Sequence, residues 1–126
     1  MTGLTYDTGA VVAAERGDRE LWALHRRALE RGIRPVVPAG VLAQAWRGGP
    51  QPQVSRLLQG CRVDDLDEVG ARSAGAACAR ARTSDVIDAI VAVGAVSRGD
   101  LVVTSDPKDI RRLASALGAQ VALHVV

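Results

Sequence analysis

The stretch Leu101-Val-Val-Thr-Ser-Asp106-Pro-Lys-Asp109-Ile110 decides the fold class of this 126-residue chain. Its β-branched run predicts a short strand over residues 101–104, and the proline that follows indicates the start of a helix. Asp106 would lie just past the end of this strand, with Asp109 at the start of the helix. Ligand sites in open parallel sheets lie beyond the carboxyl ends of the strands, so the stretch predicts a candidate site as well as an α/β element.

Short apolar runs alternate with amphipathic segments along the rest of the chain, a pattern typical of a parallel sheet covered by helices. Strands are predicted at residues 4–6, 35–38, 61–66 (as a strand or an edge strand), 101–104 and 121–126. Helices are predicted at residues 10–14, 17–31, 41–46, 54–58, 67–81, 85–97 and 110–117. Neither a repeat nor a linker divides the chain. We expect one α/β domain over residues 1–126, with a central, mostly parallel sheet flanked by helices in three layers.

Composition limits the classes of function. The chain is 48% hydrophobic and 24% charged, which is typical of a globular domain and excludes a disordered or collagen-like chain. Tyr6, Trp22 and Trp46 are its only aromatic rings, so rows of stacked bases are not expected. Of the 16 basic residues, only Lys108 is lysine. Arginine favours bidentate contacts to phosphate or carboxylate, although an arginine-rich coding bias explains the same count.

The sequence also indicates where the protein works. Cys61 and Cys78 match neither a metal-ligand spacing nor a disulfide framework, so a reducing cytoplasm is expected. No apolar stretch approaches the ~20 residues that a membrane span needs, so no membrane partner is expected. The apolar residues 10–14 run directly into Glu15 and Arg16, which does not match a signal peptide.

Five aspartates that are distant in the sequence are expected at one rim of the sheet. Asp7 follows the first strand, and Asp106 and Asp109 follow the fourth. Asp85 and Asp88 are three residues apart in the first turn of helix 85–97, and therefore on the same side of it. Like charges held a few ångströms apart are costly unless a cation or a shared proton offsets them. Oxygen ligands without histidine or cysteine favour Mg²⁺ or Mn²⁺, which suits metal-assisted hydrolysis of a phosphoester.

Helix capping is an alternative explanation for part of this set. Asp106, Pro107 and Asp109 match an N-cap, an N1 proline and an N3 acid. Asp85 matches a first-turn acid that complements the helix dipole. Asp88 is harder to explain in this way, because it interrupts an apolar helix whose burial would leave the charge without a partner.

Three further polar residues have two interpretations each. The hydroxyls of Thr8 and Ser105 lie beside acids at strand ends, where they could orient a carboxylate or a metal-bound water, or simply form turns. His25 lies on the apolar stripe of helix 17–31, where a core or interface role is expected rather than catalysis.

The chain resembles the PIN-domain family, and within it the VapC toxins of bacterial toxin–antitoxin pairs. The resemblance covers essentially the whole chain and rests on the order of three motifs: Leu4-Thr-Tyr-Asp7-Thr8, Asp88-Ala-Ile-Val-Ala92, and the stretch from Leu101 to Ile110. It implies a PIN-like fold and a Mg²⁺- or Mn²⁺-dependent endoribonuclease that hydrolyses RNA. It also implies a cognate VapB-like antitoxin that covers the site, and a homodimer.

The resemblance implies that Asp7 and Asp88 bind the metal and that Asp106 or Asp109 is the further acid. We take Asp7, Asp88, Asp106 and Asp109 as the candidate catalytic residues, the first three as metal ligands, with Asp85, Thr8, Gln44 and Ser105 in supporting roles. The family commonly has a glutamate where this chain has Gln44, in Val41-Leu-Ala-Gln44-Ala-Trp46. A glutamine ligand carries no charge and would hold the metal less tightly. Glu15 is a candidate substitute from the first helix.

Two functions therefore stay open at this point. One is an active ribonuclease toxin, with arginines contacting the RNA backbone. The other is a catalytically weakened or inactive PIN domain that binds RNA or protein. A receiver-like signalling module is disfavoured, because Asp7 stands alone after the first strand and Lys108 follows the fourth strand rather than the fifth.

Overall fold

Five short parallel strands form a single sheet in this computed structural model, which describes residues 2–126. The strands are β1 (Leu4–Tyr6), β2 (Val36–Pro38), β3 (Arg62–Asp64), β4 (Leu101–Thr104) and β5 (Leu123–Val125), in the spatial order β3-β2-β1-β4-β5. Thr5 of the central strand is in register with Val36 on one side and Val102 on the other. The chain thus builds β2 and β3 on one side of β1, then crosses back to build β4 and β5 on the other.

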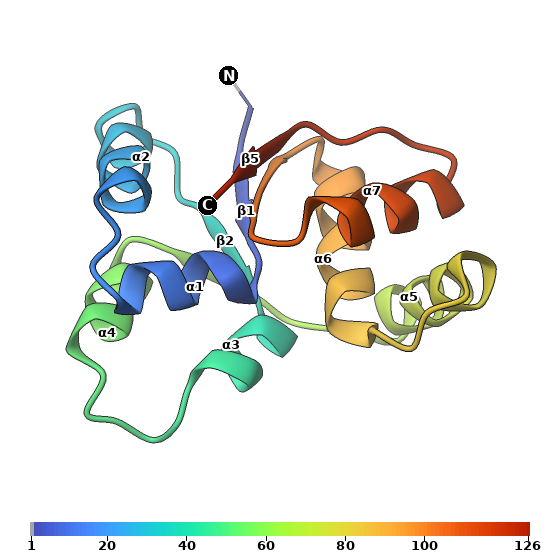
Figure 1. The fold of residues 1–126 in the computed structure, drawn as a ribbon, viewed down its shortest axis with the longest axis horizontal. Coiled ribbons are helices and arrows are strands. Elements are labelled where there is room, and N and C mark those ends of the chain that lie inside the picture. The colour runs from blue at the N-terminus through green and yellow to red at the C-terminus, as the bar shows by residue number, and fades with distance from the viewer. Residues whose placement is uncertain (1) are drawn as a thin grey trace.

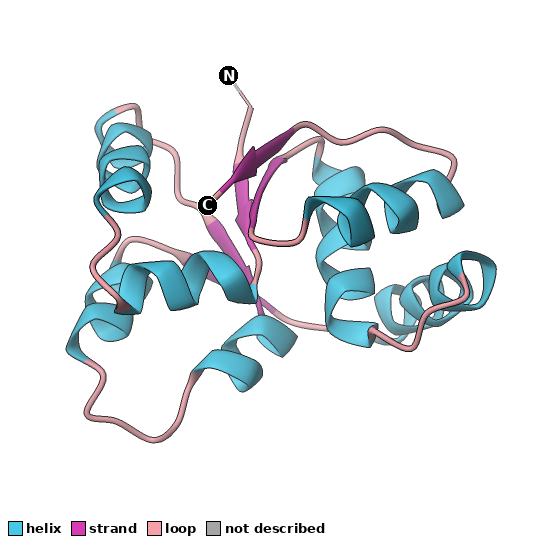
Figure 2. Ribbon diagram, viewed as in Figure 1, coloured by secondary structure: helices cyan, strands magenta, loops and turns pink. Residues whose placement is uncertain are grey.

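Helices cover both faces of the sheet, so the predicted three-layer α/β architecture is confirmed (Figure 1). One group comprises α1 (Thr8–Glu15), α2 (Arg19–Glu30), α3 (Ala39–Ala45) and α4 (Pro52–Gln59). The other comprises α5 (Glu68–Ala81), α6 (Val86–Arg98) and α7 (Pro107–Ala116). Figure 2 shows the strands between these two groups. None of the helices in the described residues is both long and apolar enough to cross a membrane.

Local signals in the sequence set most helix boundaries. Aspartate side chains cap α1, α2, α5 and α6 by accepting the backbone N–H three residues further on: Asp7, Asp18, Asp67 and Asp85. Proline occupies the first position of α4 and α7. Because Asp7 caps α1, this helix begins at Thr8, two residues before the predicted start. The final strand is shorter than the predicted 121–126, and β3 lies at the sheet edge, as the edge-strand alternative predicts.

Two apolar cores flank the sheet. The larger one joins the sheet to α1, α2 and α4, and includes Tyr6, Leu21, Val37 and Leu57. His25 is buried in this layer with Nδ1 2.9 Å from the Tyr6 hydroxyl, which agrees with the expected core role. The smaller core joins α5, α6 and α7 through four alanines and one leucine: Ala74, Ala77, Ala89, Ala92 and Leu113.

Helix α6 is central and largely buried, as the apolar residues around most of its circumference predict. Its fully buried residues are Ala89, Val91, Ala92 and Ala95, and three further apolar side chains pack partly buried against the two cores: Ile87, Ile90 and Val93. Val86, in the first turn, is 52% exposed. The reason is that α6 packs between β1 on one side and α5 and α7 on others, which leaves its N-terminal turn open.

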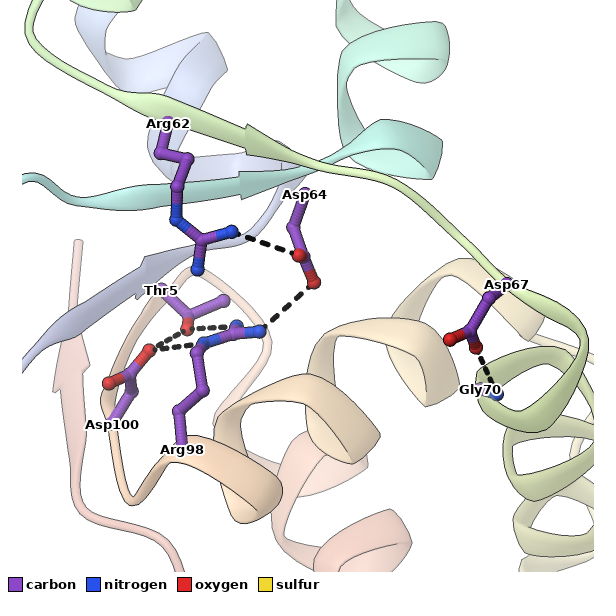
Figure 3. Close-up of polar contacts among 7 residues, drawn as sticks. All are labelled: Thr5, Arg62, Asp64, Asp67, Gly70, Arg98 and Asp100. Carbon is purple, nitrogen blue, oxygen red and sulfur yellow. Dashed lines mark hydrogen bonds and ion pairs between the residues drawn. The ribbon is translucent and has the colours of Figure 1, made fainter.

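An ion-pair network fixes the C-terminal end of α6 to the sheet (Figure 3). The Arg98 guanidinium donates to Asp100 (Nε to Oδ2, 2.9 Å), to Asp64 (Nη1 to Oδ2, 3.0 Å) and to the Thr5 hydroxyl (3.0 Å). Thr5 in turn donates to Asp100 at 2.7 Å. Asp100 and Thr5 are buried, and Arg98 is the cation that offsets the charge of the Asp100 carboxylate. The network links β1, β3 and the residue just before β4 to the end of α6.

Replacing this arginine should therefore be costly. We expect Arg98→Met to lower the free energy of unfolding by about 3 kcal/mol, because the buried Asp100 carboxylate loses its partner. Arg72→Met is the control: Arg72 pairs with Glu68 at 2.8 Å, but both side chains are exposed, and its loss should cost below about 0.5 kcal/mol. Urea denaturation measures both values, and equal losses would contradict a structural role for the Arg98 network.

Candidate active site

A cleft of about 490 Å³ opens at the carboxyl ends of β1 and β4. These are the adjacent strands at which the sheet order reverses, which is where open α/β sheets bind ligands. Four of the five aspartates highlighted by the sequence line it, together with both predicted hydroxyl residues: Asp7, Asp85, Asp88, Asp106, Thr8 and Ser105. Val12 and Ala13 of α1, together with Arg16 and Asp18 beyond its end, also line the cleft. Groups that are up to 99 positions apart in the sequence thus share one cleft.

Asp7 is the most firmly held of these acids. It is only 2% exposed, and its side chain caps α1 by accepting the Ala10 N–H at 2.9 Å. Its second oxygen accepts a hydrogen bond from the Thr104 hydroxyl. Burial raises the pKa of Asp7, and the hydrogen bonds from Thr104 and from the backbone of Ala10 and Ser105 partly oppose that rise. The carboxylate is therefore fixed in position at the base of the cleft.

Thr104 is the site residue that sequence reasoning missed. Its buried hydroxyl donates to Asp7 and accepts the backbone N–H of Asp106 at 2.8 Å. It therefore couples the end of β1 to the loop between β4 and α7. The available signal was a hydroxyl residue closing the apolar run Leu101-Val-Val, but β-propensity explains a threonine there equally well.

Gly9 permits the close approach of α1 to the same loop. A Cβ atom at this position would lie 1.9 Å from Ser105 Oγ and 3.1 Å from the Ser105 backbone nitrogen. A side chain at this position would require Ser105 or the backbone of the two segments to shift. Ser105 thus contributes through its packing against Gly9 as well as through its position in the cleft.

The two acids of α6 have different surroundings. Asp85 is exposed and caps the helix, because one of its carboxylate oxygens accepts the Asp88 N–H at 3.0 Å. Capping therefore explains the role of that oxygen. Asp88 is half-buried, and burial raises its pKa to about 7, helped by the nearby charges of Asp85, Asp106 and Asp7. Acids from three separate elements therefore influence one carboxyl group.

The acids that follow β4 are also distinct. Asp106 occupies the N-cap position of α7, and its side chain makes no capping hydrogen bond there. Burial and the adjacent Asp109 carboxyl raise the pKa of Asp106. Asp109 pairs with Arg112 at 3.2 Å. It does not line the cleft, although one of its oxygens lies close to the acids of α6.

The donor set fits a hard divalent ion, although the closest grouping differs from the predicted one. Within residues 2–126, the carboxylates with oxygens all within 4.8 Å of one another are Asp85, Asp88 and Asp109. The predicted ligands were Asp7, Asp88 and Asp106. Asp88 belongs to both groups, and Asp7 and Asp106 line the same cleft and raise its pKa. Carboxylate oxygens without nitrogen or sulfur ligands suit Mg²⁺ or Mn²⁺.

Hydrogen bonds within the protein engage both Gln44, the expected supporting residue, and Glu15, the candidate substitute for the missing glutamate. The Gln44 carbonyl oxygen, the atom expected to coordinate a metal, accepts a hydrogen bond from the Thr8 hydroxyl at 2.5 Å. Glu15 accepts a hydrogen bond from Gln51 at 2.7 Å and does not line the cleft. The candidate substitution of Glu15 for the missing glutamate is therefore wrong, because Glu15 lies at the far end of α1 from Asp7.

Comparison with known proteins supports the fold. No family model matches the chain, and no curated protein matches it. The structure resembles VapBC2 from Rickettsia felis bound to a fragment of promoter DNA, with a TM-score of 0.73, 14% identity and 97% of both chains covered. It also resembles DNA-bound VapBC from Salmonella typhimurium, with a TM-score of 0.71, 20% identity and coverage of 99% of this chain and 98% of that one. A third similar structure is PAE2754 from Pyrobaculum aerophilum, with a TM-score of 0.62, 17% identity and coverage of 94% of this chain and 89% of that one.

The raised pKa of Asp88 predicts how stability depends on pH without metal. Its folded pKa of about 7 exceeds the unfolded value, so the folded state binds more protons between these two values. The free energy of unfolding should therefore fall as pH rises from about 4 to about 7. Thermal midpoints in EDTA at pH 5 and pH 8 measure this change, and Asp88→Asn should reduce it. Adding Mn²⁺ at pH 8 should raise the wild-type midpoint. An unchanged pH response in Asp88→Asn would contradict the assignment.

The Thr104 hydroxyl should contribute more to stability and to Mn²⁺ affinity than the volume of the side chain does. Thr104→Val removes the donor to Asp7 and the acceptor for the Asp106 N–H, and should cost about 1–3 kcal/mol of stability. We also expect Mn²⁺ affinity, measured by titration calorimetry, to fall about tenfold because Asp7 and Asp106 lose their common anchor. Thr104→Ser keeps the hydroxyl and should retain near wild-type affinity. Equal affinities for the two variants would exclude a positioning role.

Proposed function

We propose that this chain, a VapC-like PIN domain by its fold, is a divalent-metal-dependent endoribonuclease and the toxin of a toxin–antitoxin pair. The observation that carries the proposal is the convergence of Asp7, Asp85, Asp88 and Asp106 in one cleft. Burial raises the pKa of three of them, which means that the cleft disfavours their negative charge. A divalent cation would offset that cost, and phosphodiester hydrolysis is chemistry that such a cation supports.

Asp7, Asp88 and Asp106 are the proposed metal ligands, with Asp85 and Asp109 as neighbouring acids. A bound Mg²⁺ or Mn²⁺ would activate water and neutralise charge that develops on the phosphoryl group. Asp7 supplies a carboxylate whose position is fixed by Ala10 and Thr104. Asp109 already has an oxygen within 4.8 Å of oxygens of Asp85 and Asp88, and its ion pair with Arg112 at 3.2 Å offsets part of its charge. We propose it as a catalytic residue of secondary importance.

Residues around the acids are suited to hold an RNA strand. Arg16 is an exposed cation on the cleft wall, where it would contact an RNA phosphate. Thr8 and Ser105 line the same cleft and offer hydroxyls for hydrogen bonds to the strand. Val12 and Ala13 supply an apolar surface against the ribose. Contacts of this kind orient the backbone without selecting a base sequence.

A VapB-like antitoxin is the proposed protein partner, which follows from the fold shared with VapBC proteins. A second cleft, of about 530 Å³, fits such a partner between α2 and α4. Its floor contains Trp22 and His25, whose rings meet edge to face at 5.6 Å. Arg56 lies 4.1 Å above the Trp22 ring, and Arg26 is on the rim. An antitoxin segment with apolar and acidic side chains would match this surface. A homodimer remains part of the proposal on the resemblance alone.

Substituting the acids tests the chemistry. Asp7→Asn and Asp88→Asn should each lower Mn²⁺-dependent cleavage of a labelled RNA pool at least about 100-fold, because each removes a charged ligand. Asp67→Asn is the matched control, since Asp67 is an exposed cap of α5 and asparagine also caps helices. EDTA should abolish cleavage by the wild type.

Two outcomes would contradict the enzyme proposal. If the wild type shows neither Mg²⁺- or Mn²⁺-dependent cleavage nor ion binding, the chain is not a metal-dependent nuclease. If it binds RNA without cleaving any substrate, the weakened or inactive PIN domain suggested by Gln44 is the better description.

A further inference from the structure

The end of α3 and the turn that follows it carry three exposed side chains of different chemistry. Gln44 offers an amide, Trp46 an indole that is 39% exposed, and Arg47 a guanidinium. The chain has only three aromatic residues, and the other two, Tyr6 and Trp22, are engaged in the core around His25. Trp46 is therefore the one aromatic face of this chain that is neither buried nor part of the α2–α4 cleft.

We propose that residues 44–47 bind one nucleotide step of single-stranded RNA beside the cleft. Trp46 stacks on a base, Arg47 contacts the adjoining phosphate, and the amide nitrogen of Gln44 donates to the same strand. The inference deepens the proposed function, on which it rests for the identity of the ligand. It gives Gln44 a role in substrate binding in place of the metal coordination expected from the sequence.

The contact between Gln44 and Thr8 supports this role for Gln44. The Gln44 carbonyl oxygen accepts from the Thr8 hydroxyl at 2.5 Å, so the amide oxygen is already engaged. The two N–H groups of the amide remain as donors. Thr8 follows Asp7 directly and lines the cleft, which places these donors at the edge of the cleft. A glutamate here would offer only acceptors, and it would repel a phosphate.

Hydrogen bonds from the Gln51 side chain hold the turn that carries Trp46. The Gln51 side chain accepts the Arg47 N–H at 2.7 Å and donates to the Ala45 carbonyl at 3.0 Å and to Glu15 at 2.7 Å. These bonds tie the turn to the end of α3 and to α1. The backbone around the indole is therefore ordered before binding, which lowers the entropic cost of stacking a base.

Arg47 supplies the positive charge of the proposed nucleotide site. Its guanidinium donates to the carbonyls of Trp46 at 2.9 Å and Ala43 at 3.4 Å, which hold it at the end of α3. None of the ion pairs among residues 2–126 involves Arg47. The remaining N–H groups of an exposed guanidinium suit a phosphate oxygen.

The composition of the surface favours RNA over a protein partner. The core of a protein interface needs contiguous apolar area, whereas Trp46 is followed by Arg47, Gly48 and Gly49 and lies near Gln44. An isolated ring flanked by an amide and a cation matches the way single-stranded RNA is recognised, by stacking on one face of a base and by contacts to its backbone.

Tryptophan fluorescence tests the stacking directly. All variants carry Asp88→Asn so that RNA is bound but not cut, and the probe is a mixed-sequence single-stranded RNA dodecamer. With Trp22→Phe, Trp46 is the only indole, and RNA should quench its emission. With Trp46→Phe, Trp22 is the only indole, and its emission should stay constant. Absence of quenching at Trp46 on saturation with RNA would overturn the proposal.

Affinity measurements complete the test. Trp46→Ala and Arg47→Ala should each raise the Kd for the dodecamer about tenfold, and Gln44→Glu should raise it while strengthening Mn²⁺ binding in the chain with Asp88 intact. Arg111→Ala, an exposed arginine on α7, is the control and should leave the Kd within about twofold. Circular dichroism verifies that each variant is folded.

The remaining outcomes separate this inference from the proposed function. If Trp46→Ala changes only the mass measured by light scattering and leaves RNA affinity unchanged, the surface is a protein interface and the inference is wrong. If the wild type cleaves no RNA but loses affinity on Trp46→Ala, the inference stands and the ribonuclease proposal fails. If RNA is cleaved while Trp46→Ala and Arg47→Ala bind it normally, the ribonuclease stands and the inference fails.

Discussion

Mutual repulsion among carboxylates at the ends of β1 and β4 is the constraint on which the candidate site depends. The parallel pairing of these two strands brings Asp7 beside the loop that carries Asp106, and α6 adds Asp85 and Asp88 to the same cleft. Burial makes each negative charge more costly, as the raised pKa values of Asp7, Asp88 and Asp106 indicate. A cluster of this kind is stable only where the surrounding structure holds it rigidly, or where a cation offsets its charge.

The rigid support comes from both ends of α6 and from the hydroxyl that joins the strands. At its N-terminus α6 presents Asp85 and Asp88 to the cleft, and at its C-terminus Arg98 ties it to β1, β3 and the residue before β4. Thr104 fixes Asp7 relative to the loop after β4. The acids therefore have little freedom to move apart, so their repulsion persists in the folded state and favours cation binding.

The functional proposal and the further inference meet at Thr8, in the first turn of α1. Asp7 and Thr8 at its start belong to the acidic cleft, while Gln44 reaches Thr8 from α3 and places a neutral amide beside that cleft. The solved structures that share the fold at 14% and 20% identity include VapBC proteins, and at that identity they support the architecture alone. A neutral Gln44 reduces the negative charge that an approaching RNA phosphate meets, which is consistent with a role in substrate binding.

The sequence by itself determined the α/β class, nearly all helix and strand positions, and the placement of four aspartates at one rim. These follow from local signals, namely hydrophobic periodicity, aspartate caps such as Asp18 and Asp67, and helix-starting prolines. Three contacts were decided only by the tertiary structure. Thr104 donates a hydrogen bond to Asp7, 97 positions away, and Arg98 donates one to Thr5, 93 positions away. Glu15 accepts a hydrogen bond from Gln51 and does not line the cleft. The physical reason is that these contacts depend on strand register and side-chain reach, which no local pattern encodes.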